Sequence, residues 1–255
     1  MDTFEPDRLF TALVGSHNYN LNIETSDKDY IGFVIPSYDD LYKGTIMPTK
    51  ESKIDGNDVK LHDIRRLPEY LWKSNTSFAE LLFSSEVHID DVRYVAFVDE
   101  IFARRNDLVT MNLPYLYNSM RGLMHEVGKT IVRKTGHNDH VIDRYGYDVK
   151  RASHIYRSGV FLIRFARTHD FETALRFPDD DPMRAYLLDI KTGNIPYETF
   201  QQHYAHLVND VETNRPIYYA HQPDESVHND MNDIIKRLVK CHVLNTLECH
   251  TNMGG

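Results

Sequence analysis

The chain has 255 residues, 41% of them hydrophobic and 26% charged, enough for one large domain or two small ones with real cores. Its 29 basic and 38 acidic side chains give a net charge of −9, which argues against bulk coating of duplex DNA or a membrane surface. Two cysteines argue against a disulfide scaffold and fit a reducing compartment. No window approaches the roughly 20 apolar residues of a spanning helix, and residues 1–8 lack the order of a signal peptide. We therefore expect a cytoplasmic protein.

The N-terminal quarter of the chain reads as strands and loops. Short apolar or alternating runs predict strands over 9–14, 30–35 and 58–62. In the third run Val59 and Leu61 alternate with polar neighbours, so one face of that strand is expected to be buried. The polar stretch 38–55 receives no element.

Apolar residues recur at helical spacing through the rest of the chain. Asp181, ahead of a proline, predicts a helix N-cap, and Gly193 predicts a helix stop. The predicted helices cover 69–83, 92–105, 115–134, 147–168, 182–191, 197–210 and 227–247. We therefore expect an α+β fold, with a small mixed β-sheet and flanking helices followed by a helical C-terminal region. The predicted domains are 1–110 and 111–255.

The most informative segment joins the first two predicted strands. The first strand runs into Gly15 and Ser16, and ten residues later Asp27 and Asp29 enter the second strand. Residues two apart on a strand share a face, so these carboxylates are expected side by side. Two adjacent carboxylates repel each other unless a cation lies between them, which suits Mg²⁺ with its preference for oxygen ligands. A plain polar turn, capped by Ser26 and Asp27, is the alternative interpretation.

The spacing hydrophobic-Gly-Ser-x10-Asp-x-Asp resembles the signature of the DNA polymerase β-like nucleotidyltransferase superfamily. The wording Gly-Ser-His-Asn-Tyr-Asn-Leu, followed by Thr-Ser-Asp-Lys-Asp-Tyr-Ile-Gly, resembles its RlaP-type branch of bacteria and phages. That branch usually has glycine where this chain has Asn20. The segment 78–83 resembles the branch's Glu-Leu-Leu segment, and Lys150, His154 and Arg157 resemble part of a later helix.

The resemblance implies a third carboxylate from a later strand. Asp58 opens the strand that contains Val59 and Leu61, and Asp63 closes it. A regular strand places Asp58 on the face opposite the apolar pair and Asp63 on the same face as that pair. Asp58 is the preferred third metal ligand, Asp63 is the alternative, and an exposed acid at a strand end is the structural interpretation of either.

The resemblance also implies an activity: transfer of an NMP from an NTP such as ATP to a hydroxyl acceptor, with release of pyrophosphate. The NTP phosphates would meet Gly15 and Ser16 at a helix N-terminus. Asp27, Asp29 and Asp58 would hold one or two Mg²⁺ ions. The acceptor stays open between an RNA end, a protein and a small molecule, and the rival hypothesis is a non-catalytic nucleotide-binding or regulatory protein.

One segment is locally basic. Between residues 121 and 170 the chain has ten Lys or Arg and five acidic residues. Lys150, His154, Arg157 and Arg164 have the spacing of one helical face. They are predicted either to bind a triphosphate or acceptor or to form a solvated surface.

Overall fold

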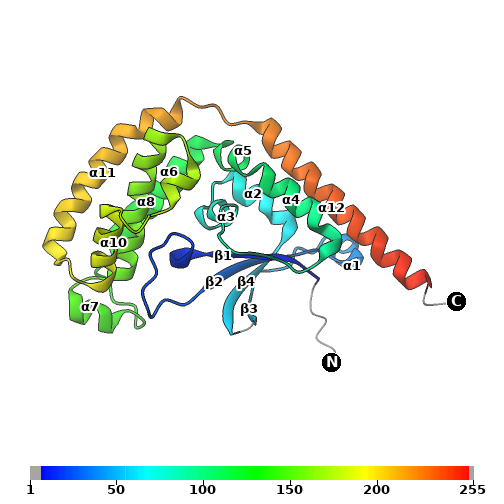
Figure 1. Ribbon diagram of the computed structural model, residues 1–255, viewed down its shortest axis with the longest axis horizontal. Helices are drawn as coiled ribbons and strands as arrows, with labels where there is room; N and C mark the ends of the chain where they lie inside the picture. The colour runs from blue at the N-terminus through cyan, green and yellow to red at the C-terminus, as the bar shows by residue number, and fades with distance from the viewer. Residues whose placement is uncertain (1–6, 55, 253–255) are drawn as a thin grey trace. The chain divides into compact units, whose positions relative to one another are not determined.

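The computed structural model describes residues 7–54 and 56–252, except for the side chains of Ile54 and residues 248–252 (Figure 1). Residues 1–6, which entered the signal-peptide argument, and the side chain of Cys249 lie outside this description. The described chain forms two compact units. The sheet unit contains the chain up to Gly15, Asp27–Met111 and the chain from Asp224, and the helical unit contains Ser16–Ser26 and Asn112–Pro223.

The sheet unit is built on a mixed five-stranded sheet. Strand β2 pairs in parallel with β4, and the other pairings are antiparallel. The strands follow the order β3-β4-β2-β1-β5. Their bounds are Arg8–Val14 for β1, Asp29–Val34 for β2, Lys50–Ile54 for β3, Asn57–Asp63 for β4 and Val87–Ile89 for β5.

Both faces of the sheet carry apolar side chains, because β1 and β2 are nearly continuous hydrophobic runs. On one face Phe33 packs against Phe10 and, from α3, against Phe78, with ring centroids 5.4 and 5.9 Å apart. Helices α2 and α3 lie over this face (Figure 1). On the other face, the buried cluster consists of Leu13, Tyr30, Val34, Val59 and Leu61.

The sheet unit also contains six helices among its described residues. Their bounds are Tyr38–Tyr42 for α1, Leu67–Trp72 for α2, Thr76–Leu81 for α3, Val95–Ala103 for α4, Arg105–Thr110 for α5 and Glu225–Asn252 for α12. The long helix α12 packs against α2, α4 and α5, so the end of the chain returns to the sheet unit.

The prediction of one helix over 69–83 is wrong, because the chain breaks between α2 and α3. Ser74 has a left-handed φ of 47°, and the Asn75 side chain accepts a hydrogen bond from Ser77 N–H as the cap of α3. The helix predicted from residue 92 begins at Val95, after a 3-10 turn. Strands β3 and β5 and helices α1, α5, α7 and α9 are additional to the prediction.

The helical unit is organised around α8, which packs against α6, α9, α10 and α11. As predicted, Asp181 caps α10, accepting a hydrogen bond from Met183 N–H at 2.9 Å, and Gly193 ends that helix with a φ of 79°. The helices are α6 Leu113–Thr130, α7 Asp139–Tyr145, α8 Val149–Thr168, α9 Phe171–Leu175, α10 Pro182–Thr192 and α11 Tyr197–Tyr219.

The fold is therefore α+β, as the sequence predicts: a small mixed sheet with flanking helices and a helical C-terminal region. The contacts divide the chain at Met111, next to the predicted boundary after residue 110, and they also assign the loop Ser16–Ser26 to the helical unit. A catalytic domain over 1–110 and a separate domain over 111–255 stay predictions. Within the described ranges, no helix combines the length and apolar character needed to span a membrane.

Candidate functional site

The signature turn begins where β1 ends. Gly15 has a φ of 76°, a left-handed conformation that L side chains adopt only with strain. A Cβ added to Gly15 would lie 3.2 Å from Asp29 Oδ2. Glycine is thus required here both by the backbone conformation and by the closeness of the Asp29 carboxylate.

The Gly15 amide already has a partner. It donates a hydrogen bond of 3.0 Å to Oε1 of Glu80, a side chain of α3 that is only 3% exposed. The expectation of a helix N-terminus with amides open to phosphate at Gly15 is therefore corrected in two respects. The chain forms only a three-residue 3-10 turn, Gly15–His17, and a buried carboxylate occupies its first amide.

Asp29 and Asp58 occupy the same register position on neighbouring parallel strands. Paired residues of a sheet project to the same face, and neighbouring strands lie about 4.8 Å apart. Both side chains are exposed, and Asp58 has an exposed ion-pair partner in Lys53 at 3.4 Å. Such a surface pair contributes little stability, so it is a weak competitor for a divalent cation.

Asp27 lies outside the strand. Strand β2 begins at Asp29, and both Asp27 and Lys28 precede it as exposed residues. The assumption that strand alternation places Asp27 beside Asp29 is therefore wrong. Asp27 is the first residue of the sheet unit after the loop Ser16–Ser26.

Asp63, the alternative third carboxylate, is a structural residue. It is 1% exposed, and its Oδ2 lies 2.6 Å from Arg65 Nη2. It also accepts hydrogen bonds from the backbone N–H groups of Met47, at 3.2 Å, and of Arg65, at 3.0 Å. With its oxygens committed to these partners, Asp63 is a poor metal ligand, and this favours Asp58 for that role.

Glu86 contacts Tyr30, whose side chain projects to the sheet face opposite that of Asp29. Its carboxylate accepts a hydrogen bond of 2.6 Å from Tyr30 Oη and one of 2.9 Å from Lys28 Nζ, and His88 Nε2 also lies 2.9 Å away. The hydrogen bonds from Tyr30, His88 and Lys28 lower the pKa of Glu86 to about 2. This ionised carboxylate ties down Lys28, the residue between Asp27 and Asp29.

The donor chemistry of this site fits Mg²⁺, which usually takes one or two protein carboxylates together with substrate phosphates and water. Asp29 and Asp58 supply two exposed carboxylates at one register position. In the part of the chain that the structure describes, no three His, Cys, Asp or Glu side chains gather as a metal cluster. The fit therefore rests on two carboxylates with a phosphate ligand, and a closed cage made by the protein alone is not formed.

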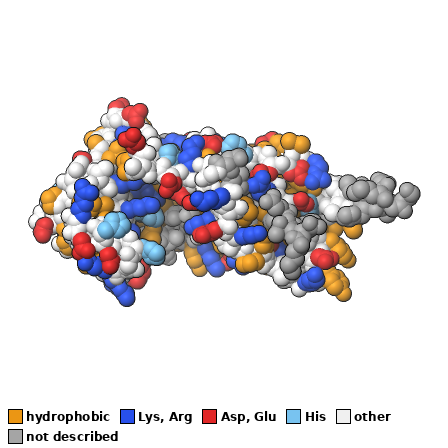
Figure 2. Space-filling view, turned by 90° about the horizontal axis from the view of Figure 1, so that it is seen from below, with side chains coloured by type: hydrophobic (Ala, Val, Ile, Leu, Met, Phe, Trp, Pro, Cys, Tyr) orange, Lys and Arg blue, Asp and Glu red, His pale blue; other side chains and the backbone are white. Residues whose placement is uncertain are grey.

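The residues of the predicted basic face lie on α8 in the helical unit and differ in environment. Lys150 and His154 are exposed, whereas Arg157 is 6% exposed, with its guanidinium carbon 3.8 Å from the centre of the Tyr19 ring. Arg164 is ion-paired with Asp181. A uniformly solvated face is therefore wrong, because two of the four residues, Arg157 and Arg164, are committed to contacts within the unit. On the molecular face that Figure 2 shows, basic and acidic side chains are interspersed.

The backbone conformation at residue 20 explains why asparagine can stand where the resembling sequences usually have glycine. It has a φ of 64°, in the left-handed region that glycine adopts most easily and that asparagine tolerates better than most other residues. Its Nδ2 donates hydrogen bonds to the Phe177 carbonyl at 2.9 Å and to Asp179 Oδ1 at 3.0 Å. Asn20 therefore fits a left-handed turn position and is anchored there by two hydrogen bonds.

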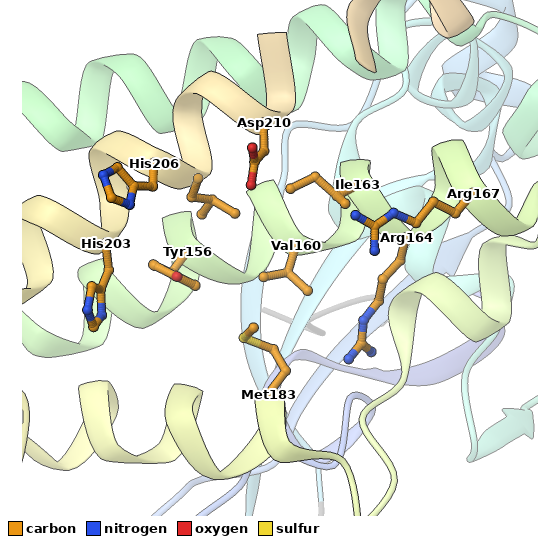
Figure 3. A pocket seen from close by; sticks show the side chains of 10 residues that line it. Tyr156, Val160, Ile163, Arg164, Arg167, Met183, His203, His206 and Asp210 are labelled. Carbon is orange, nitrogen blue, oxygen red and sulfur yellow. The ribbon is translucent and has the colours of Figure 1, made fainter. Parts of the chain in front are cut away.

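A pocket of about 350 Å³ opens in the helical unit between α8, α10 and α11 (Figure 3). Its lining includes Arg164 and Arg167 from α8 and His203, His206 and Asp210 from α11. Of the residues of the predicted basic face, Arg164 lines the pocket, whereas Gly15, Ser16 and the candidate carboxylates do not. The ion pair with Asp181 compensates the charge of Arg164, and Asp210 also lines the pocket. The pocket is therefore not purely basic.

Sequence reasoning did not assign Glu80 a role. The sequence signal is the Glu-Leu-Leu segment at 80–82, which by itself indicates no function. Spacing in the sequence does not show that a glutamate 65 residues later bonds the Gly15 amide. The structure adds Glu80 to the candidate site, which then consists of Gly15, Asp27, Asp29, Asp58 and Glu80.

A scan against protein families finds no match for this chain, and a search of curated proteins finds none either. Among solved structures, the chain is similar to a nucleotidyltransferase-like protein from Exiguobacterium sibiricum, known from a crystal structure. The TM-score is 0.31 and the identity 12%, over 83% of this chain and 69% of that chain. A functional conclusion therefore has to rest on the residues of this chain.

Proposed function

We propose that this protein is a Mg²⁺-dependent nucleotidyltransferase that moves an NMP from an NTP to a hydroxyl acceptor. The close approach of Gly15 to Asp29 carries the proposal, since a Cβ at Gly15 would come within 3.2 Å of Asp29 Oδ2. Without a Cβ at Gly15, the Asp29 carboxylate lies directly against the turn. Beside carboxylates, this arrangement suits a phosphate that arrives with its cation. The signature resemblance described above is independent support.

In the proposed reaction, the acceptor hydroxyl oxygen forms a bond to the α-phosphorus. The bond from that phosphorus to the oxygen bridging to the β-phosphate breaks, and pyrophosphate leaves with this oxygen. The hydroxyl proton passes to a carboxylate, and Asp58 is our candidate because it is exposed and in register with Asp29. When bound, Mg²⁺ supplies charge neutralisation to the triphosphate.

Glu80 is proposed to hold the turn rather than to react, because it is buried and its Oε1 accepts the Gly15 N–H. Ser16 stays the proposed phosphate contact of the turn, whereas the amide of Gly15, the other residue expected to meet phosphate, is bonded to Glu80. Lys150, His154 and Arg157 remain proposed triphosphate contacts on the strength of the family resemblance alone. The acceptor class is an outcome of the experiment below.

The test is incubation with each α-labelled NTP and Mg²⁺, together with total cellular RNA or total protein. We expect label to move to one acceptor class, and Asp29→Asn to abolish the transfer. Asp99→Asn makes the same chemical change at an exposed position of α4 and should leave transfer intact. Nucleotide binding without transfer would favour the non-catalytic rival, and full transfer by Asp29→Asn would refute the site.

A further inference from the structure

The loop Ser16–Ser26, which links β1 to β2, is held by cationic side chains of the helical unit. Figure 1 shows the loop, in dark blue, beside α8 and α10. These contacts are mostly to backbone carbonyls, which a loop leaves without partners unless side chains or water supply donors. The geometry points to a positioning role for these cations.

Three arginine side chains of the helical unit contact the first half of the loop. Arg176 Nη1 donates to the Asn18 carbonyl at 3.0 Å, and Arg184 Nε donates to the Asn20 carbonyl at 2.8 Å. The guanidinium of Arg157 stacks on the Tyr19 ring. Asn18 and Tyr19 are 1% and 7% exposed, so this half of the loop is packed and not a free surface segment.

The second half is held by Lys191, near the end of α10. Its Nζ donates hydrogen bonds to the Leu21 carbonyl at 2.9 Å and to Ser26 Oγ at 3.1 Å. Burial, followed by the charge of Lys150, lowers the pKa of Lys191.

The hydroxyl, the amide and the carbonyl of Ser26 each have a polar contact. Its Oγ also accepts the Ile23 N–H at 2.9 Å, and its own N–H donates to the Ile23 carbonyl at 2.9 Å. Its carbonyl lies 3.0 Å from His17 Nε2, which closes the base of the loop. The residue that follows Ser26 is Asp27.

We propose that Lys191, assisted by Arg184, is a positioning residue for the nucleotidyl-transfer site. By fixing Leu21 and Ser26, it restricts the backbone conformations from which Asp27 can reach a metal ion. The inference rests on the proposed function, but it concerns a different part of the chain from the carboxylates themselves.

The test compares Lys191→Met with Lys191→Arg and with Lys129→Met. Lys129 lies on α6 of the same unit, is exposed and lies 3.9 Å from Glu126, so it is the matched control. The first readout is hydrogen exchange at the amides of Leu21, Ile23 and Ser26. Lys191→Met should speed exchange there by about tenfold, which corresponds to about 1.4 kcal/mol of local stability, and Lys129→Met should not.

The second readout is the Mn²⁺ or Mg²⁺ concentration for half-maximal binding and transfer. Lys191→Met should raise it about fivefold or more through the looser carboxylate geometry, and Lys191→Arg should restore most of the wild-type value. Unchanged exchange in Lys191→Met would overturn the inference, as would faster exchange with unchanged metal affinity and transfer. Wild-type protein that neither binds Mn²⁺ nor transfers label would refute the proposed function, and the exchange data would still show whether Lys191 holds the loop.

Discussion

Substitution of Gly15 by alanine separates the cost of a strained backbone from damage to the candidate site. Gly15 has a φ of 76°, and its new Cβ would lie 3.2 Å from Asp29 Oδ2. Gly44 has a φ of 65°, and a Cβ there would meet nothing within 4 Å. Gly44→Ala therefore has a comparable backbone cost without the contact, which makes it the matched control.

The backbone term is about 1–2 kcal/mol for an L residue in the left-handed region. At about 2–4 °C per kcal/mol for a chain of this size class, both variants should lower Tm by about 2–8 °C. At Gly15, the Asp29 carboxylate must also move by a few tenths of an ångström. Because a misplacement of about 1 Å can cost about 100-fold in rate, we expect Gly15→Ala to slow transfer about fivefold to tenfold.

Thermal unfolding and transfer rate at saturating Mg²⁺ measure the two effects independently. Both variants should unfold earlier, and Gly15→Ala alone should lose activity at a temperature where both remain folded. Equal transfer rates for the two variants would show that the closeness of Gly15 to Asp29 has no catalytic meaning.

Three further predictions concern carboxylates. Asp27→Asn and Asp29→Asn should each abolish transfer. Tm should change little for Asp27→Asn, an exposed residue, and should hold or rise for Asp29→Asn, because a negative charge in register with Asp58 is removed; near-normal turnover by either would contradict the metal site. Asp63→Asn should lower the free energy of unfolding by about 3–5 kcal/mol in denaturant titration, because it breaks the buried pair with Arg65, and the remaining folded protein should keep its Mg²⁺ dependence. Glu86, with a folded pKa of about 2 against an ordinary 4.5, stabilises the fold above pH 4.5, and this contribution is lost as the pH falls toward 2. Acid unfolding of Glu86→Gln should therefore depend less on pH in that window, and an unchanged dependence would show that the three donors around Glu86 contribute nothing.

The parts of the fold that follow from local pattern were predictable. Strands β1, β2 and β4 are apolar or alternating runs, and the burial of Val59 and Leu61 at 2% and 5% confirms the expected face. Strand β3 has the sequence Lys-Glu-Ser-Lys-Ile and β5 has three residues, so neither carries a hydrophobic period. The break at Ser74 needs a left-handed residue that the helical spacing of its neighbours does not reveal.

The candidate site was predictable only where the signature is local. Gly15, Asp27 and Asp29 were identified from their spacing, and the register of Asp29 with Asp58 agrees with the choice of Asp58 over Asp63. The bond from Lys191 to Leu21 spans 170 residues and ends on a backbone carbonyl, a contact that no residue pattern encodes. Assignment of the signature loop to the helical unit therefore required the three-dimensional structure.

The measurement that tests nucleotidyl transfer most directly is the ratio of pyrophosphate released to NMP transferred, for the wild-type chain with Mg²⁺ and its acceptor. The proposed reaction predicts a ratio of one, together with loss of both products on chelation of Mg²⁺ and in Asp29→Asn. Pyrophosphate release without NMP on any acceptor would contradict it. Wild-type amounts of both products from Asp29→Asn would contradict it as well.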